Sequence, residues 1–133
     1  MEPVKVVVRY LNGKVIKGFT QDFFPNKDRF HLRQAVQASG DSAIVMVKDL
    51  KAIFFVQDFE GNAQYNERKN YGEGDKAQGK KVEVTFADGE TLVGSTMGYD
   101  PNRQGFFLFP VDPKSNNMRV YAVTSAVKQV RNL

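Results

Sequence analysis

An internal repeat constrains the fold of this chain more than any other feature of its sequence. With Gly13 placed over Gly89, an offset of 76 residues, residues 5–32 align without a gap over residues 81–108. Apart from Lys5/Lys81, the identities are small, turn-forming and apolar residues: Val6/Val82, Val8/Val84, Gly13/Gly89, Gly18/Gly94, Thr20/Thr96, Pro25/Pro101, Asn26/Asn102, Phe30/Phe106 and Leu32/Leu108. Such a match predicts one supersecondary unit that is used twice.

The repeat also predicts the organisation of the chain. Farther along, the offset falls to 74, with Ala52 over Ala126, so the second copy is expected to be about two residues shorter within a loop. We expect a first copy at 1–57, a polar linker at 58–79 and a second copy at 80–133. The linker ends in the stretch GEGDKAQG, which is typical of a flexible segment.

Each copy has the pattern of five short strands. Apolar and polar residues alternate from Val4 to Tyr10, and the hairpin signal Asn12-Gly13 follows. Gly18 lies inside the next apolar stretch, as is typical of a bent strand. The strands of the first copy are expected at residues 4–10, 15–24, 29–34, 43–47 and 52–56, and the second copy repeats this order.

Few stretches have helical periodicity, so the predicted class is all-β. Five short strands in about 55 residues, one of them bent, predict a small closed or nearly closed barrel, since closure removes exposed edges. The predicted fold is therefore two tandem five-stranded small barrels. A unit of this size buries a small share of its surface, so the two copies are expected to pack together or to share an edge strand.

The strand pattern resembles the first motif of Sm-like and other SH3-like small barrels. The residues that carry it are Val6, Val8, Tyr10, Asn12, Gly13, Ile16, Gly18 and Leu32, with Val82, Val84, Phe86, Asp88, Gly89, Leu92, Gly94 and Leu108 in the second copy. The stretches VRYLNGKVIKGFTQDFFPN and FADGETLVGSTMGYDPNRQGFFLFPVDP are also similar to an uncharacterised bacterial domain family, whose members occur alone or beside signalling domains such as PilZ. These resemblances imply a fold but no established activity.

The residue types present disfavour catalysis. The chain has no cysteine, and His31 is its sole histidine, so neither a thiolate site nor a histidine pair for a metal can form. Carboxylates such as Asp22, Asp88 and Asp100 fall in or beside turns, and capping of the turn by the side chain accounts for Asp88 and Asp100 without catalysis. His31 lies between Phe30 and Leu32 on an expected strand, which indicates a surface or interface position. We expect no enzyme activity, no catalytic residue, no metal and no cofactor.

The sequence also bears on location. No apolar run approaches the roughly 18 residues of a membrane span, and the first ten residues do not resemble a secretory signal. We therefore expect a cytoplasmic protein, bacterial by its resemblance, without a membrane partner. The oligomeric state is left open.

Basic residues provide the candidate contacts. The net charge is +4. It comes mainly from the first copy, because the negative charge of the acidic linker offsets the positive charge of the second copy. One candidate surface is the basic face of the first hairpin: Lys5, Arg9, Lys14 and Lys17. The other candidate surface is the pair of turns that share the pattern Pro-Asn-basic. Turn geometry does not require a basic residue, so its presence in both copies indicates a contact. The residues are Asn26, Lys27, Asn102 and Arg103.

These observations favour a non-enzymatic binding or regulatory module with another protein as its partner. The alternative is a module that binds RNA or single-stranded DNA on the basic face, where aromatic residues, if exposed, would stack on bases: Phe23, Phe24, Tyr99 and Phe107. Clustered cations are typical of phosphate binding, and here the excess is thin.

Overall fold

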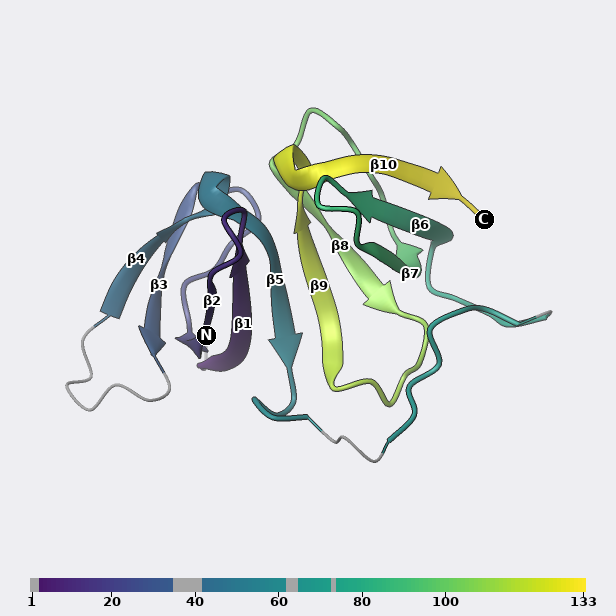
Figure 1. Ribbon diagram of the computed structural model, residues 1–133, viewed down its shortest axis with the longest axis horizontal. Helices are drawn as coiled ribbons and strands as arrows, with labels where there is room; N and C mark the ends of the chain where they lie inside the picture. Colours follow the sequence, from purple (N-terminus) through teal and green to yellow (C-terminus); the bar gives the residue numbers. More distant parts are fainter. Residues whose placement is uncertain (1–2, 35–41, 62–64, 73) are drawn as a thin grey trace.

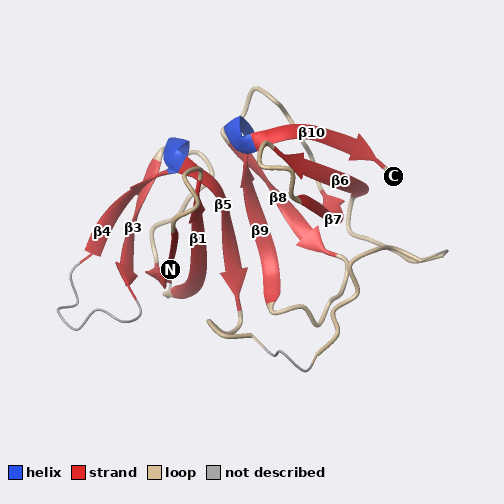
Figure 2. Cartoon of the chain, viewed as in Figure 1, coloured by secondary structure: helices blue, strands red, loops and turns tan. Residues whose placement is uncertain are grey.

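A computed structural model describes residues 3–34, 42–61, 65–72 and 74–133, and over these residues the fold is all-β (Figures 1 and 2). The N-terminal half contains β1 (Val4–Tyr10), β2 (Val15–Thr20), β3 (Arg29–Gln34), β4 (Ser42–Met46) and β5 (Leu50–Val56). The C-terminal half contains β6 (Lys80–Phe86), β7 (Thr91–Thr96), β8 (Gly105–Pro110), β9 (Asn117–Val123) and β10 (Val127–Asn132). A single 3-10 turn precedes the last strand of each half, η1 (Val47–Asp49) and η2 (Thr124–Ala126).

All ten strands form one antiparallel sheet in the order β10-β6-β7-β8-β9-β5-β1-β2-β3-β4. The halves meet at its centre, where β5 and β9 lie side by side and Phe54 is opposite Val120 (Figure 1). The all-β class is therefore as predicted, but the expected pair of closed or nearly closed barrels is replaced by one open sheet. The reason is that β5 would have to meet β4 to close a barrel, and it pairs through that edge with β9 instead.

The strand registers of the two halves correspond at the predicted offset over their first three strands. Val6 lies opposite Gly18, and Val82 lies opposite Gly94. In the last strands the correspondence differs from the prediction: Val6 is opposite Phe55 and Val82 is opposite Asn132, an offset of 77 rather than 74. The C-terminal half is thus one residue longer, not two shorter. Sequence comparison failed here because β5 is buried at the junction whereas β10 forms a polar edge of the sheet.

Three expected strands also have different bounds: the strand expected at 43–47 is β4 at Ser42–Met46, and two others differ more. The strand expected at 15–24 ends at Thr20, because the chain then turns and Asp22 accepts hydrogen bonds from His31 on β3. The last strand of the first half starts at Leu50, directly after η1.

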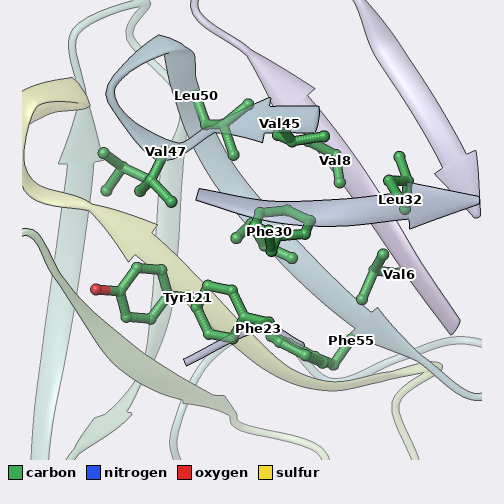
Figure 3. Close-up of a cluster of buried hydrophobic side chains, with 12 residues drawn as sticks. Val6, Val8, Phe23, Phe30, Leu32, Val45, Val47, Leu50, Phe55 and Tyr121 are labelled. Atoms are coloured by element: carbon green, nitrogen blue, oxygen red, sulfur yellow. The ribbon is translucent and has the colours of Figure 1, made fainter. Parts of the chain in front are cut away.

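The sheet separates two hydrophobic cores, and strands of both halves contribute to each. The first core contains Val6, Val8, Phe23, Phe30, Leu32, Val45, Val47, Leu50, Ile53, Phe55, Tyr121 and Val123. Figure 3 shows Tyr121 of β9 next to Phe23, with their ring centroids 5.0 Å apart. The second core contains Val7, Ala52, Phe54, Val56, Val82, Val84, Phe86, Phe106, Leu108, Val120, Ala122 and Ala126.

Strand β5 explains how two cores share one sheet. Every residue of β5 is buried. Ile53 and Phe55 belong to the first core, whereas Ala52, Phe54 and Val56 belong to the second. A strand buried on both faces has a continuous apolar run rather than alternation, as residues 52–56 do. Each face of the sheet therefore covers a core in one half and faces solvent in the other half.

The described part of the linker is bonded to the C-terminal half. The buried carboxylate of Asp112 accepts hydrogen bonds from the Tyr65 hydroxyl at 2.6 Å and from the backbone N–H of Arg68 at 3.1 Å. Asn116 exchanges two hydrogen bonds with the backbone of Asp58. Near the linker's end, the Asp75 carboxylate accepts from the backbone N–H of Gly72 at 2.7 Å. Of the stretch expected to be flexible, Glu73 lies outside the described residues.

The helical content of the described residues is limited to short turns, and none of these could cross a lipid bilayer.

Candidate functional site

Two hollows lie at corresponding places in the two halves. Strands β2 and β3 pair at only two positions, Gly18 with Gln34 and Phe19 with Arg33, before they diverge. Strands β7 and β8 do the same, with pairs at Gly94 and Ser95. A hollow lies at each divergence, and five of the lining positions correspond at the offset of 76: Thr20/Thr96, Gln21/Met97, Asp22/Gly98, His31/Phe107 and Arg33/Phe109.

The hollow of the C-terminal half, which we call the aromatic hollow, has a volume of about 570 Å³. Its characteristic side chains are Met97, Tyr99, Phe106, Phe107, Phe109 and Tyr121. Met97 is 75% exposed and Tyr99 is 39% exposed, and the rings of Tyr99 and Phe106 pack edge to face at 4.8 Å. The rim carries Arg103, whose Nε lies 3.9 Å from Oδ2 of Asp100.

The first of the predicted turns borders this hollow. Gln104 Nε2 donates hydrogen bonds to the carbonyl oxygens of Pro25 and Lys27, at 3.3 and 2.8 Å, and the Tyr121 hydroxyl donates to Pro25 at 3.3 Å. The structure thus brings the turn at 24–27 next to the start of β8. The turn at 100–103, which precedes β8, is therefore its neighbour.

The four turn residues proposed as contacts have different surroundings. All four side chains are exposed. Arg103 lines the aromatic hollow, whereas the Lys27 ammonium lies 5.2 Å from the centre of the Phe24 ring. The backbone N–H of Asn102 donates to Asp100 at 2.9 Å, so Asp100 caps its turn as expected. Asn26 belongs to the turn that borders the hollow.

The hollow of the N-terminal half, which we call the polar hollow, has a volume of about 500 Å³. Its wall contains Gln21, Asp22, His31 and Arg33, where the aromatic hollow has Met97, Gly98, Phe107 and Phe109. Ser42 of β4, opposite Arg33, completes this wall. Corresponding positions are therefore charged or polar in one half and apolar in the other.

Asp22 and His31 form the most constrained pair in the polar hollow. Asp22 Oδ2 lies 2.6 Å from His31 Nδ1, and Asp22 Oδ1 accepts from the His31 backbone N–H at 2.9 Å and from the Thr20 hydroxyl at 3.2 Å. Partial burial opposes ionisation of Asp22, but these hydrogen bonds outweigh it and hold its pKa below the ordinary value. The His31 side chain is 56% exposed, so its expected surface position is observed.

The basic face of the first hairpin is formed in part. Lys5, Arg9 and Lys17 project from the outer face of β1 and β2. Phe19 of this face is opposite Arg33 of β3, so Arg33 and Arg29 lie on the same face. Lys17 donates to the Phe59 carbonyl at 3.0 Å and Lys5 to the Gln57 carbonyl at 3.5 Å. The guanidinium of Arg9 lies 5.4 Å from the centre of the Phe54 ring.

Lys14 lies just beyond this face, in the turn between β1 and β2, with its ammonium 5.7 Å from the centre of the Tyr10 ring. Of the aromatic residues considered for base stacking, Phe24 is 40% exposed and Phe107 is only partly exposed. The expectation for Phe23 is wrong, because its ring is buried in the first core. Sequence reasoning missed Arg33 and Met97 as site residues. Every second side chain of a strand lies on the same face, so the alternation along residues 29–34 could have placed Arg33 beside His31. No local pattern identifies Met97.

No group of three or more metal-ligating side chains occurs within the described ranges. Neither a curated protein nor a solved structure matches the chain. A family model matches residues 2–133, in agreement with the resemblance to an uncharacterised domain family. The chain belongs to DUF6982, a family of unknown function.

Proposed function

We propose that the chain is a non-enzymatic binding and regulatory module that docks a segment of another protein in the aromatic hollow. The observation that carries this proposal is a concave surface rich in aromatic side chains, with Met97 75% exposed at its edge. Concave apolar surfaces with a few polar groups are typical of binding sites. Methionine adapts its shape to different apolar partners, and aromatic side chains supply large contact areas.

The rim indicates the chemistry of the docked segment. Arg103 has an 80% exposed side chain and lies 3.9 Å from Asp100, at the outer limit of an ion pair. Its guanidinium N–H groups can therefore donate hydrogen bonds to a carboxylate of the partner. The proposed ligand is a segment with an apolar or aromatic anchor next to an acidic residue. Within this proposal Lys27 and Asn26 on one turn, and Arg103 and Asn102 on the other, are partner contacts.

Two further parts of the proposal concern origin and location. The recurring strand registers, such as Val6 opposite Gly18 and Val82 opposite Gly94, support an internal repeat that arose by duplication. We place the module in the cytoplasm of a bacterium, where it would act on its partner by association alone.

Selection of displayed peptides on the full chain tests the docking proposal. Selected peptides should share an apolar anchor beside an acidic residue, and Met97→Glu or Arg103→Glu should weaken their binding at least tenfold. The control is Leu11→Lys, which changes a 54% exposed apolar residue in the first hairpin. Peptides that bind Met97→Glu as tightly as the unmodified chain would contradict the proposed site.

A second candidate function, binding of RNA or single-stranded DNA, is favoured by the basic outer face of β1 to β3. The five basic residues on it are Lys5, Arg9, Lys17, Arg29 and Arg33, and the outward positions of these strands hold no carboxylate. Counter-ion release makes such binding strongly salt-dependent, with a slope of about 0.7 per phosphate contact for single strands. Binding of an oligonucleotide that weakens steeply with salt, and that Arg9→Gln reduces, would favour this function. Binding unaffected by salt would exclude it.

A further inference from the structure

The polar hollow and the aromatic hollow lie at corresponding strand divergences of the two halves, but the chemistry of their side chains differs. At corresponding positions Phe107 is replaced by His31 and Phe109 by Arg33, while the strand register around them is the same. Two aromatic rings on one wall thus correspond to two nitrogen-rich side chains on the other. A wall of this kind presents hydrogen-bond donors where the other presents apolar surface.

The imidazole of His31 is held in one orientation. Asp22 contacts Nδ1 at 2.6 Å, and a carboxylate with its pKa lowered only accepts hydrogen bonds, so the proton resides on Nδ1. Asp22 is itself fixed by the backbone N–H of His31 and by the hydroxyl of Thr20, a residue that is 2% exposed. The remaining ring nitrogen, Nε2, therefore lies on the side away from Asp22, and in the imidazolium form it carries an N–H that can donate to a ligand oxygen.

The guanidinium of Arg33 is held by an aromatic face. It lies 5.3 Å from the centre of the Phe19 ring, and Phe19 packs edge to face on Phe59 at 5.3 Å. Stacking uses the face of the guanidinium and leaves its in-plane N–H donors for other partners. Among the residues that the structure describes, no carboxylate lies within ion-pair distance of Arg33.

The charges in this hollow select an anion. Asp22 is the carboxylate of the described lining, and its oxygens are occupied by His31 and Thr20. A guanidinium, an oriented imidazole and the Ser42 hydroxyl remain, and Lys17 adds a positive charge on the same face. Arginine N–H groups match phosphate oxygens in pairs, and a dianion gains more from this field than a carboxylate does.

We propose that the polar hollow binds the phosphoryl group of a small organic phosphate monoester. A hollow of about 500 Å³ holds more than the phosphoryl group alone, so the organic part occupies the space beside Phe19 and Gln21. This site is separate from the aromatic hollow and does not depend on the docking function.

Titration of the full chain with phenyl phosphate, inorganic phosphate and benzoate, at constant pH and ionic strength, tests this site. Phenyl phosphate should bind saturably and shift the NMR signals of His31 and Arg33. Inorganic phosphate should bind several-fold more weakly, and benzoate at least tenfold more weakly. Arg33→Gln should weaken phenyl phosphate binding at least tenfold, and His31→Gln should weaken it three- to tenfold.

The matched control is Arg131→Gln. Arg131 lies on β10 and pairs with Glu83 at 3.1 Å, so this change alters the net charge equally but leaves the hollow intact. Met97→Glu should also leave phenyl phosphate binding unchanged, which separates this site from the aromatic hollow. Equal losses in Arg33→Gln and Arg131→Gln would overturn the site, since they would indicate only general charge attraction. Benzoate binding as tightly as phenyl phosphate would overturn the phosphoryl preference, and inorganic phosphate binding as tightly would overturn the organic ligand.

Discussion

The ammonium group of Lys51 lies 2.7 Å from Oδ2 of Asp88 and so joins the last strand of one half to the first hairpin of the other. The same ammonium contacts the Glu90 carboxylate and lies 4.9 Å from the centre of the Phe86 ring. The Lys51 side chain is only 11% exposed. In the pairing of β1 with β5, Arg9 is opposite Ala52 and Tyr10 is opposite Leu50, so Lys51 has no partner on β1. Its side chain can therefore reach across the junction.

Replacing Lys51 by methionine should destabilise the junction. The change keeps much of the aliphatic part but removes two charge-assisted contacts, so we expect a loss of about 1 to 2 kcal/mol in the free energy of unfolding. Urea denaturation measures it. Lys128 occupies the corresponding skipped position on β10, where its side chain is exposed. Lys128→Met should therefore change stability by less than about 0.5 kcal/mol, and equal effects of the two changes would contradict a specific role for Lys51.

The junction should also respond to pH at both extremes. Hydrogen bonding to Lys51 lowers the pKa of Asp88 from 3.8, so its stabilising contribution is complete above pH 3.8 and is lost as the pH falls through the folded-state value. Burial opposes the charge of Lys51, but Asp88 and Glu90 outweigh it and raise the pKa of Lys51 above 10.5. Its contribution is complete below pH 10.5 and is lost as the pH rises through the folded-state value. Chemical denaturation across this pH range should show both losses, and Lys51→Met should reduce them.

Removing the carboxylate of Asp112 should release the linker from the C-terminal half. Tyr65 and the backbone N–H groups of Arg68 and Lys114 hydrogen-bond to this carboxylate, and its pKa is lowered for this reason. In Asp112→Ala, trypsin should cleave after Arg68 or Lys69 several-fold faster than in the unmodified chain. Asp100→Ala removes a turn-capping carboxylate elsewhere and should leave the rate unchanged. Equal cleavage rates in all three proteins would show that Asp112 does not hold the linker.

A side chain at Gly18 should be poorly tolerated. A Cβ atom there would lie 2.4 Å from the Arg33 carbonyl oxygen, so β2 and β3 could not approach as they do. We expect Gly18→Ala to lower the free energy of unfolding by about 2 to 3 kcal/mol. At Gly98, which has open space around it, the same change should be nearly neutral. Thermal unfolding of both variants checks this, and a neutral Gly18→Ala would show that the strands separate readily.

Local patterns were sufficient to predict the strands, because alternation and turn signals depend on neighbouring residues. Asn12-Gly13 ends β1 at its expected place, with Gly13 at a φ of +92°. The connection between the halves could not be predicted in this way. Whether β5 meets β4 or β9 depends on side chains more than 60 positions away in sequence, such as Tyr121.

The candidate sites were predicted less completely than the strands. The turn with Arg103 was identified because it recurs, and the structure places it on the rim of a hollow. The polar hollow was not predicted, because its lining residues come mainly from β2, the turn after it, β3 and β4, and no local pattern joins them. His31 was expected at the surface, and its partner Asp22 was treated as one of several turn carboxylates. Their pairing depends on how the chain turns after Thr20, and no spacing rule encodes that turn.

The change of sides along the sheet has a consequence for stoichiometry. The outward residues of β3 lie on the face of the sheet that continues into the second core, whereas Phe107 and Phe109 of β8 lie on the other face. The two hollows therefore open on opposite faces and do not compete for space. One chain therefore has room for the two proposed ligands at the same time, and paired strands separate the two hollows. With both proposed ligands bound, the chain would hold two unlike molecules on opposite sides of one sheet.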